Sequence, residues 1–102
     1  MTSKDNVAIH QLFSLLESRF AIRVLWGLKN GQAQTFRALQ ESIGSITPNT
    51  LNTRLKELRA ATLVTHGDTG YVLTSQGLDL VKRLNDLGGF ANKWAITQAR
   101  RK

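Results

Sequence analysis

A short segment that begins at Thr47, TPNTLNTRLKELRAATLV, restricts the fold more than any other part of the chain. Thr47 can accept a hydrogen bond from the exposed amides of a first helical turn. Pro48 suits the first helical position because its φ is preset and it has no amide hydrogen to leave unpaired. The apolar residues that follow are spaced by four and three residues and therefore share one helix face: Leu51, Leu55 and Leu58. The pattern predicts a helix over about residues 47–61 with its leucine face buried.

The opposite face of this predicted helix carries uncharged and basic groups that suit the grooves of DNA. An asparagine can form two hydrogen bonds with adenine, threonine offers a hydroxyl and a methyl group, and lysine can reach guanine or phosphate. We therefore expect base-edge contacts from the residues that point away from the leucines: Asn49, Asn52, Thr53 and Lys56. A face that simply contacts water would have a similar composition, so the interpretation depends on the rest of the chain.

The charge of the chain favours a polyanionic partner. Its 102 residues suit one domain over residues 1–102, and they include 14 Lys and Arg against 7 Asp and Glu, a formal charge of +7. Such a protein gains affinity for nucleic acid through counterion release, and an anionic membrane surface is the weaker candidate. Because basic groups also lie within the leucine-backed segment, double-stranded DNA is the expected partner.

Several other chemistries are excluded or lack support in the sequence. The chain has no cysteine, which excludes disulfides, zinc fingers and thiol catalysis. His10 and His66 lie far apart without ligand spacing, so no metal is expected. There is no G-x-S-x-G elbow and no phosphate-cradling glycine loop, so we expect neither an enzyme nor a bound cofactor. The N-terminus lacks a long apolar stretch and Arg23 interrupts the most apolar helix candidate, which predicts a cytoplasmic protein without membrane contact.

Apolar periodicity predicts three helices before the leucine-backed one. The first covers about residues 5–18 and starts from a cap at Asp5 or Asn6. The second covers about residues 19–29 and carries apolar side chains around much of its surface, so it is expected to be the central helix. The third is shorter and begins at Thr35.

A change of period after the leucine-backed segment predicts a β-hairpin. Leu63–Thr65 and Tyr71–Leu73 are its expected strands, and HGDTG is the turn between them. A last helix follows over about residues 75–98, with a break or bend expected at Gly88-Gly89. This order predicts a mainly α fold with a small β-hairpin, a winged helix-turn-helix with extra terminal helices.

The run FRALQESIGSITPNTLNTRLKELRAATLV, followed by YVLTSQGLDLVKRL, resembles the HxlR-type branch of winged-helix transcription regulators, a group near the MarR-like regulators. The shared pattern is F-x-x-L, then L-x-x-R-L-x-x-L, then Y-x-L-T-x-x-G. The resemblance implies sequence-specific DNA binding, with the helix at about 47–61 in the major groove and the hairpin as the wing. It also implies a homodimer made by the terminal helices, at about 5–18 and 75–98, on a near-palindromic site. The implied core positions are Phe36, Leu39, Leu51, Leu55, Leu58, Leu63, Tyr71 and Leu73.

Further residues are expected to hold the DNA backbone and set the register on it. They are Thr47, Thr50 and Arg54 on the leucine-backed helix, Arg37 near the start of the preceding helix, and His66 and Thr69 on the wing. The chain departs from the resembled family in two ways. Its wing tip is short and carries Asp68, which would repel phosphate, and it lacks the N-terminal cysteine with which many relatives sense thiol-reactive stress. A small-molecule effector, if one exists, would act by other chemistry.

Two other functions are compatible with these features. A winged-helix adaptor would use the same helix, or the aromatic terminal helices, to bind protein, because a fold does not dictate function. A non-specific nucleic-acid-binding protein would show no sequence preference. The aromatic residues at helical spacing are interpreted as core or dimer contacts in preference to a ligand cavity: Phe13, Phe20, Trp26, Phe90 and Trp94.

Overall fold

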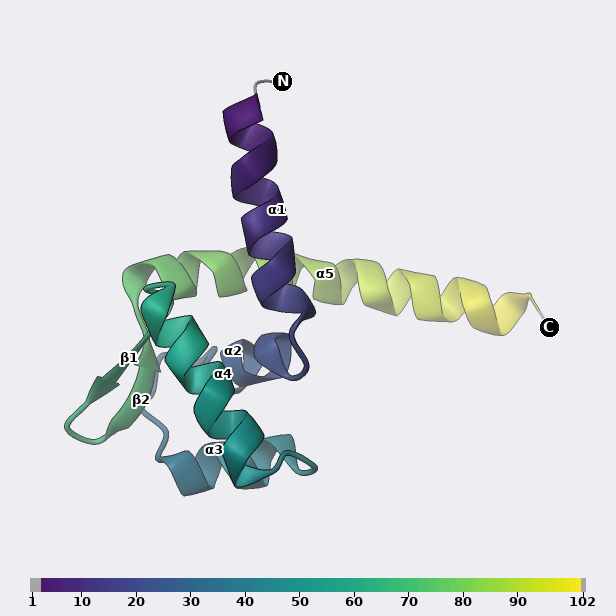
Figure 1. Cartoon of the computed structure of the whole chain (residues 1–102). Coiled ribbons are helices and arrows are strands. Elements are labelled where there is room, and N and C mark those ends of the chain that lie inside the picture. The colour runs from purple at the N-terminus through teal and green to yellow at the C-terminus, as the bar shows by residue number, and fades with distance from the viewer. Residues whose placement is uncertain (1–2, 102) are drawn as a thin grey trace.

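The computed structural model describes residues 3–101, and its elements follow the predicted order (Figure 1). The elements are α1 (Ser3–Glu17), α2 (Ala21–Gly27), α3 (Phe36–Ile43), α4 (Pro48–Ala60), β1 (Val64–Gly67), β2 (Gly70–Leu73) and α5 (Ser75–Arg100). The predicted fold class, mainly α with a small antiparallel hairpin, is confirmed.

Leucines at helical spacing form the core, with α2 at its centre. Helix α2 contacts α1, α3, α4 and α5, which explains why apolar side chains surround much of it. The largest side chains with less than 2% exposure come from three helices and from the C-cap of α2: Val24, Leu25, Leu28, Leu39, Leu51, Leu55 and Leu58. The predicted core positions Phe36 and Tyr71 are half-buried and pack against this cluster. Burial of this apolar surface is the main force that holds α3 and α4 in place.

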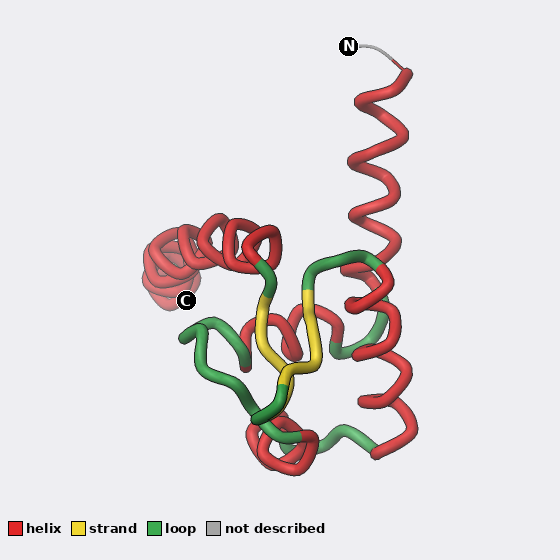
Figure 2. Tube along the Cα trace, turned by 90° about the vertical axis from the view of Figure 1, so that its left-hand side faces the viewer, coloured by secondary structure: helices red, strands yellow, loops and turns green. Residues whose placement is uncertain are grey.

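The hairpin is tighter than the sequence pattern predicted. Its strands pair antiparallel from Val64 opposite Leu73 to Gly67 opposite Gly70, so only Asp68 and Thr69 connect them (Figure 2). A single residue ahead of α3 adds to this small sheet, since the backbone N–H and C=O of Gln34 both bond with Tyr71, at 2.8 and 2.7 Å. A Cβ on Gly70 would clash with the Gln34 backbone, and glycine also tolerates the φ of +139° found there. The hairpin is therefore attached at its base to the segment that leads into α3.

The predicted bounds of two helices and one predicted helix break were wrong. Helix α1 begins at Ser3, so the predicted cap positions Asp5 and Asn6 lie within the helix. Helix α2 covers Ala21–Gly27 and not 19–29, because Phe20 adopts a left-handed conformation with φ of 73° that interrupts the helical path. Helix α5 passes through Gly88-Gly89 without a break, because a helix tolerates single glycines at a modest cost when the flanking residues favour helix.

The terminal helices extend beyond the packed body. Most of α1 and the second half of α5 point away from it in two directions (Figure 1). The Cα radius of gyration is 15.3 Å, whereas about 13 Å is typical of a compact domain of this length. Within residues 3–101, no helix combines the length and the apolar character needed to cross a membrane.

Candidate nucleic-acid interface

Helix α4 begins as the sequence predicted. The side chain of Thr47 accepts a hydrogen bond from the backbone N–H of Thr50 at 3.2 Å, and Pro48 occupies the first turn. The Thr47 hydroxyl also donates to the Thr50 hydroxyl at 3.0 Å. These contacts use the side chains of both threonines within the cap, and they leave the first turn of α4 well defined. Thr47 is exposed and Thr50 is half-buried, so both lie at the edge of the exposed face.

The four side chains predicted to touch bases lie together on the exposed side of α4. Asn49, Asn52, Thr53 and Lys56 are all exposed, and their spacing of three and four residues places them along one face of the helix. The Thr53 hydroxyl donates to the backbone carbonyl of Asn49 at 3.0 Å. The buried leucines on the opposite side hold this face toward solvent. We name these four residues the α4 polar face.

Arg54 is not part of the α4 polar face. Its Nε donates to the backbone carbonyl of Arg19 at 2.7 Å, and its guanidinium forms a 2.9 Å ion pair with Glu57. Only 18% of the Arg54 side chain is exposed. The sequence pattern placed Arg54 at the DNA backbone. It could not predict the contact with Arg19, because Arg19 and Arg54 are 35 residues apart in the chain.

The predicted wing residues lie beside α4 on the hairpin. Strand β1 contacts α4, and the hairpin emerges next to that helix (Figure 1). The imidazole ring of His66 stacks on the ring of Tyr71, with centroids 4.1 Å apart and planes 6° apart. Thr69 and the adjacent Asp68 are exposed at the tip. The stacked rings stiffen the hairpin, while the tip presents one hydroxyl and one carboxylate to solvent.

The remaining predicted contact, Arg37, is exposed at the start of α3. Its Nε lies 3.3 Å from Oε1 of Glu41, one turn later, and the two side chains are 88% and 71% exposed. An ion pair this exposed is weak and easily exchanged for another anion. Arg37 is therefore available to a phosphate in a way that Arg54 is not.

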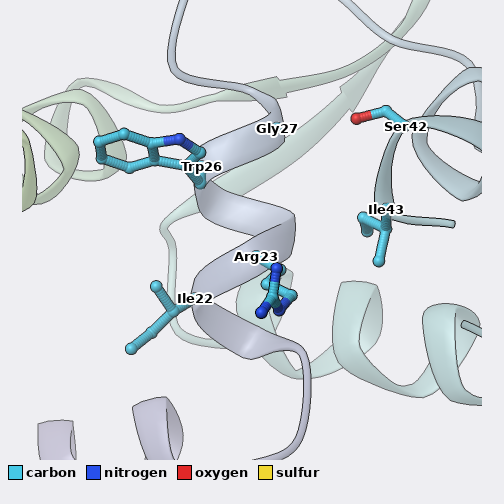
Figure 3. A pocket seen from close by; sticks show the side chains of 6 residues that line it. All are labelled: Ile22, Arg23, Trp26, Gly27, Ser42 and Ile43. Atoms are coloured by element: carbon cyan, nitrogen blue, oxygen red, sulfur yellow. The ribbon is translucent and has the colours of Figure 1, made fainter. Parts of the chain in front are cut away.

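A hollow of about 420 Å³ opens between α2 and α3 (Figure 3). Helix α2 contributes an isoleucine, an arginine and a tryptophan, and the end of α3 contributes a serine and an isoleucine. The lining residues are Ile22, Arg23, Trp26, Gly27, Ser42 and Ile43. Nζ of Lys29 lies 4.2 Å from the centroid of the Trp26 ring. Sequence reasoning identified Trp26 as a core or dimer residue and did not find this hollow.

Helices α2, α3 and α4, with the hairpin beside α4, define a winged helix-turn-helix protein, a class in which the last of three helices enters a groove of DNA. The model of the HxlR-like helix-turn-helix family matches residues 15–99. The chain belongs to this family, and it is a DNA-binding transcriptional regulator. No curated protein matches it.

Solved structures of regulators have the same fold. Quinone-bound YodB from B. subtilis is 28% identical with a TM-score of 0.77, over 84% of this chain and 97% of that one. A possible HxlR family transcriptional factor from Thermoplasma volcanium GSS1 is 26% identical with a TM-score of 0.74, over 82% and 81% of the two chains. A regulator described as MarR family from Enterococcus faecalis V583 shares the fold, with a TM-score of 0.80 at 23% identity over 98% and 96%.

Proposed function

We propose that this protein is a sequence-specific regulator that binds an operator in double-stranded DNA through the α4 polar face, and that it excludes or recruits RNA polymerase there. The observation that carries the proposal is the exposure of two asparagines, a threonine and a lysine along one side of a capped helix, backed by buried leucines. We place the protein in the cytoplasm, where it can reach chromosomal DNA, and propose no catalytic role or cofactor for it.

The two groups of residues have different roles in this proposal. Asn49, Asn52, Thr53 and Lys56 would contact base edges, because their side chains are exposed and directed away from the core. The capping threonines Thr47 and Thr50 would hold the DNA backbone, together with Arg37, His66 and Thr69. Arg54 stays outside both groups because its guanidinium is occupied inside the protein.

Replacing Asn52 by alanine is expected to relax the sequence preference at one base pair. Loss of an asparagine that bonds adenine through two hydrogen bonds should cost about 1–3 kcal/mol on the preferred sequence and little on others. Binding selection from random duplexes, followed by titration of the selected site and its single-base variants, measures this. Asn30→Ala removes an exposed amide outside the interface and is the matched control. An equal loss on every sequence would contradict the assignment.

Replacing Lys56 by alanine tests whether this side chain reaches a phosphate in addition to a base edge. If it does, affinity falls on all sequences and the slope of log Kd against log salt concentration flattens by about one unit. Fluorescence anisotropy at several salt concentrations gives the slope. Lys82→Ala removes a charge from an exposed position on α5 and should leave the slope unchanged. An unchanged slope for Lys56→Ala would restrict Lys56 to base contact.

A homodimer is part of the proposal. Apolar side chains on the two projecting helices are 39–64% exposed: Val7, Ile9 and Phe13 on α1, and Leu87, Phe90 and Trp94 on α5. Exposed apolar side chains gathered on protruding helices are typical of subunit interfaces. A two-fold pair would present two copies of α4 to a near-palindromic site.

A small-molecule effector is a further part of the proposal. It would bind in the hollow between α2 and α3, where the guanidinium of Arg23 could contact it.

Duplex titration also separates this proposal from an adaptor or a non-specific nucleic-acid-binding protein. A sequence-specific regulator shows steep salt dependence together with much tighter binding to some sequences than to others. An adaptor that binds protein would show weak background binding only, and a non-specific protein would show salt dependence without preference. Either of these results would overturn the proposal.

A further inference from the structure

The contact between Arg54 and the turn before α2 joins two parts of the molecule that the proposed function keeps separate. Arg54 lies on α4, the helix proposed to contact DNA. Arg19 lies in the turn at the base of α1, the helix proposed to contact the second subunit. Within the described residues, no other side-chain hydrogen bond links α4 to the chain before α2. The contact is charge-assisted and short, at 2.7 Å, which places it among the stronger hydrogen bonds in proteins.

The turn held by Arg54 is the pivot of the α1 arm. Ser18, Arg19 and Phe20 separate α1 from α2, and Phe20 has φ of 73°, an uncommon conformation for a residue with a side chain. Helix α2 has no side-chain cap at Phe20. Only the last part of α1 contacts the core, through the half-buried Leu15 and Leu16. The direction of the arm is therefore set at this turn, by few contacts.

The Arg54 end of the contact is fixed by an ion pair within α4. Glu57, one turn along α4, forms the ion pair with Nη1 of Arg54 and leaves Nε directed at the Arg19 carbonyl. A planar guanidinium can serve both partners at once, whereas a lysine ammonium has no such fixed geometry. The guanidinium is mostly buried, which protects these bonds from competition by water.

We propose that Arg54 is a positioning residue that ties α4 to the base of α1, so that the direction of the α1 arm sets how α4 is presented to DNA. This inference rests on the proposed function. In a dimer, the second subunit contacts α1, and a change in the direction of α1 is transmitted to α4 through the Arg54–Arg19 contact. Arg54 then contributes to DNA affinity through geometry and adds nothing to the count of phosphate contacts.

Distances between spin labels test this link in the absence of DNA. Because the chain has no cysteine, two introduced cysteines give clean labelling, and dilution with unlabelled protein removes distances between subunits. One pair joins exposed positions on α1 and α4, Gln11 and Ala60. The reference pair, Glu41 and Ala60, joins α3 to α4. Arg54→Met and Arg54→Lys should both widen the α1–α4 distribution and leave the α3–α4 distribution unchanged.

DNA binding supplies the second measurement. Both Arg54 variants should lose affinity for the selected operator by about tenfold, which lies within the range for coupled sites. The slope of log Kd against log salt concentration should stay as in the wild type. A phosphate contact gives a different pattern: the slope falls by about one unit in Arg54→Met, recovers in Arg54→Lys, and the α1–α4 distances do not change. That pattern would overturn the proposal.

Glu57→Gln keeps the experiment informative if the Arg54 variants fail to fold. It removes the ion pair and keeps both the guanidinium and the size of the residue, so the α1–α4 distribution should widen to a smaller extent. An unchanged distribution in this variant, in protein of native helix content, would contradict the link. The wild-type titrations judge the proposed function separately, because the distance measurements involve no DNA.

Discussion

Gly77→Ala is expected to unfold much of the protein, because the new methyl group has no space. Gly77 is buried in the first turn of α5, and a Cβ there would overlap the backbone carbonyl of Leu63. That carbonyl cannot move freely, since it accepts a 3.0 Å hydrogen bond from the backbone N–H of Thr74. Overpacking against fixed backbone should cost on the order of 3 kcal/mol or more of unfolding free energy. This is a large fraction of the total stability of a small domain.

Urea unfolding followed by circular dichroism measures this loss. Gly89→Ala is the matched control, because it lies in the same helix and a Cβ there has nothing within 4 Å. In that position alanine should be neutral or should raise stability by up to about 1 kcal/mol through its higher helix propensity. If Gly77→Ala were as stable as the wild type, the close approach of α5 to Leu63 would be refuted.

Trp94→Glu is expected to separate the proposed dimer and to remove most of its DNA affinity. Trp94 is 54% exposed on the projecting half of α5, and Phe90, 64% exposed, lies on the same face one turn earlier. A carboxylate at the centre of an apolar interface would be buried without a partner, which opposes association. A monomer loses the second half-site contact, so affinity should fall by about a hundredfold or more.

Analytical ultracentrifugation and operator titration measure the two effects on the same samples. Asn92→Glu introduces the same charge two residues away, on the other side of α5, and should leave both the mass and the affinity close to wild type. Helix content should be retained in both variants, because the substituted side chains do not contact the core. A Trp94→Glu protein that stays dimeric would place the subunit interface elsewhere.

Local sequence determined the helix proposed to bind DNA almost completely. Thr47 and Pro48 set its start, and the leucine spacing set which side is buried, because capping and helical periodicity act between residues close in the chain. The exposed positions of Asn49, Asn52, Thr53 and Lys56 follow from the same periodicity. The hairpin was also predictable, although strand pairing continues two residues further into the HGDTG turn than the pattern indicated.

The remaining features depend on contacts between distant parts of the chain. Glycines alone predicted a break at Gly88-Gly89, but the helix continues because its propagation depends on the sum over many residues and not on two of them. The pattern around Arg54 indicated a DNA contact, and only the packed structure brings the Arg19 carbonyl to its Nε. By itself, the sequence determined which face of α4 is exposed to solvent and which side chains that face carries. Only the tertiary structure decided which basic side chains of α4 remain available to a partner. Arg54 is not available, because it is mostly buried and its guanidinium is bonded to Arg19 and Glu57.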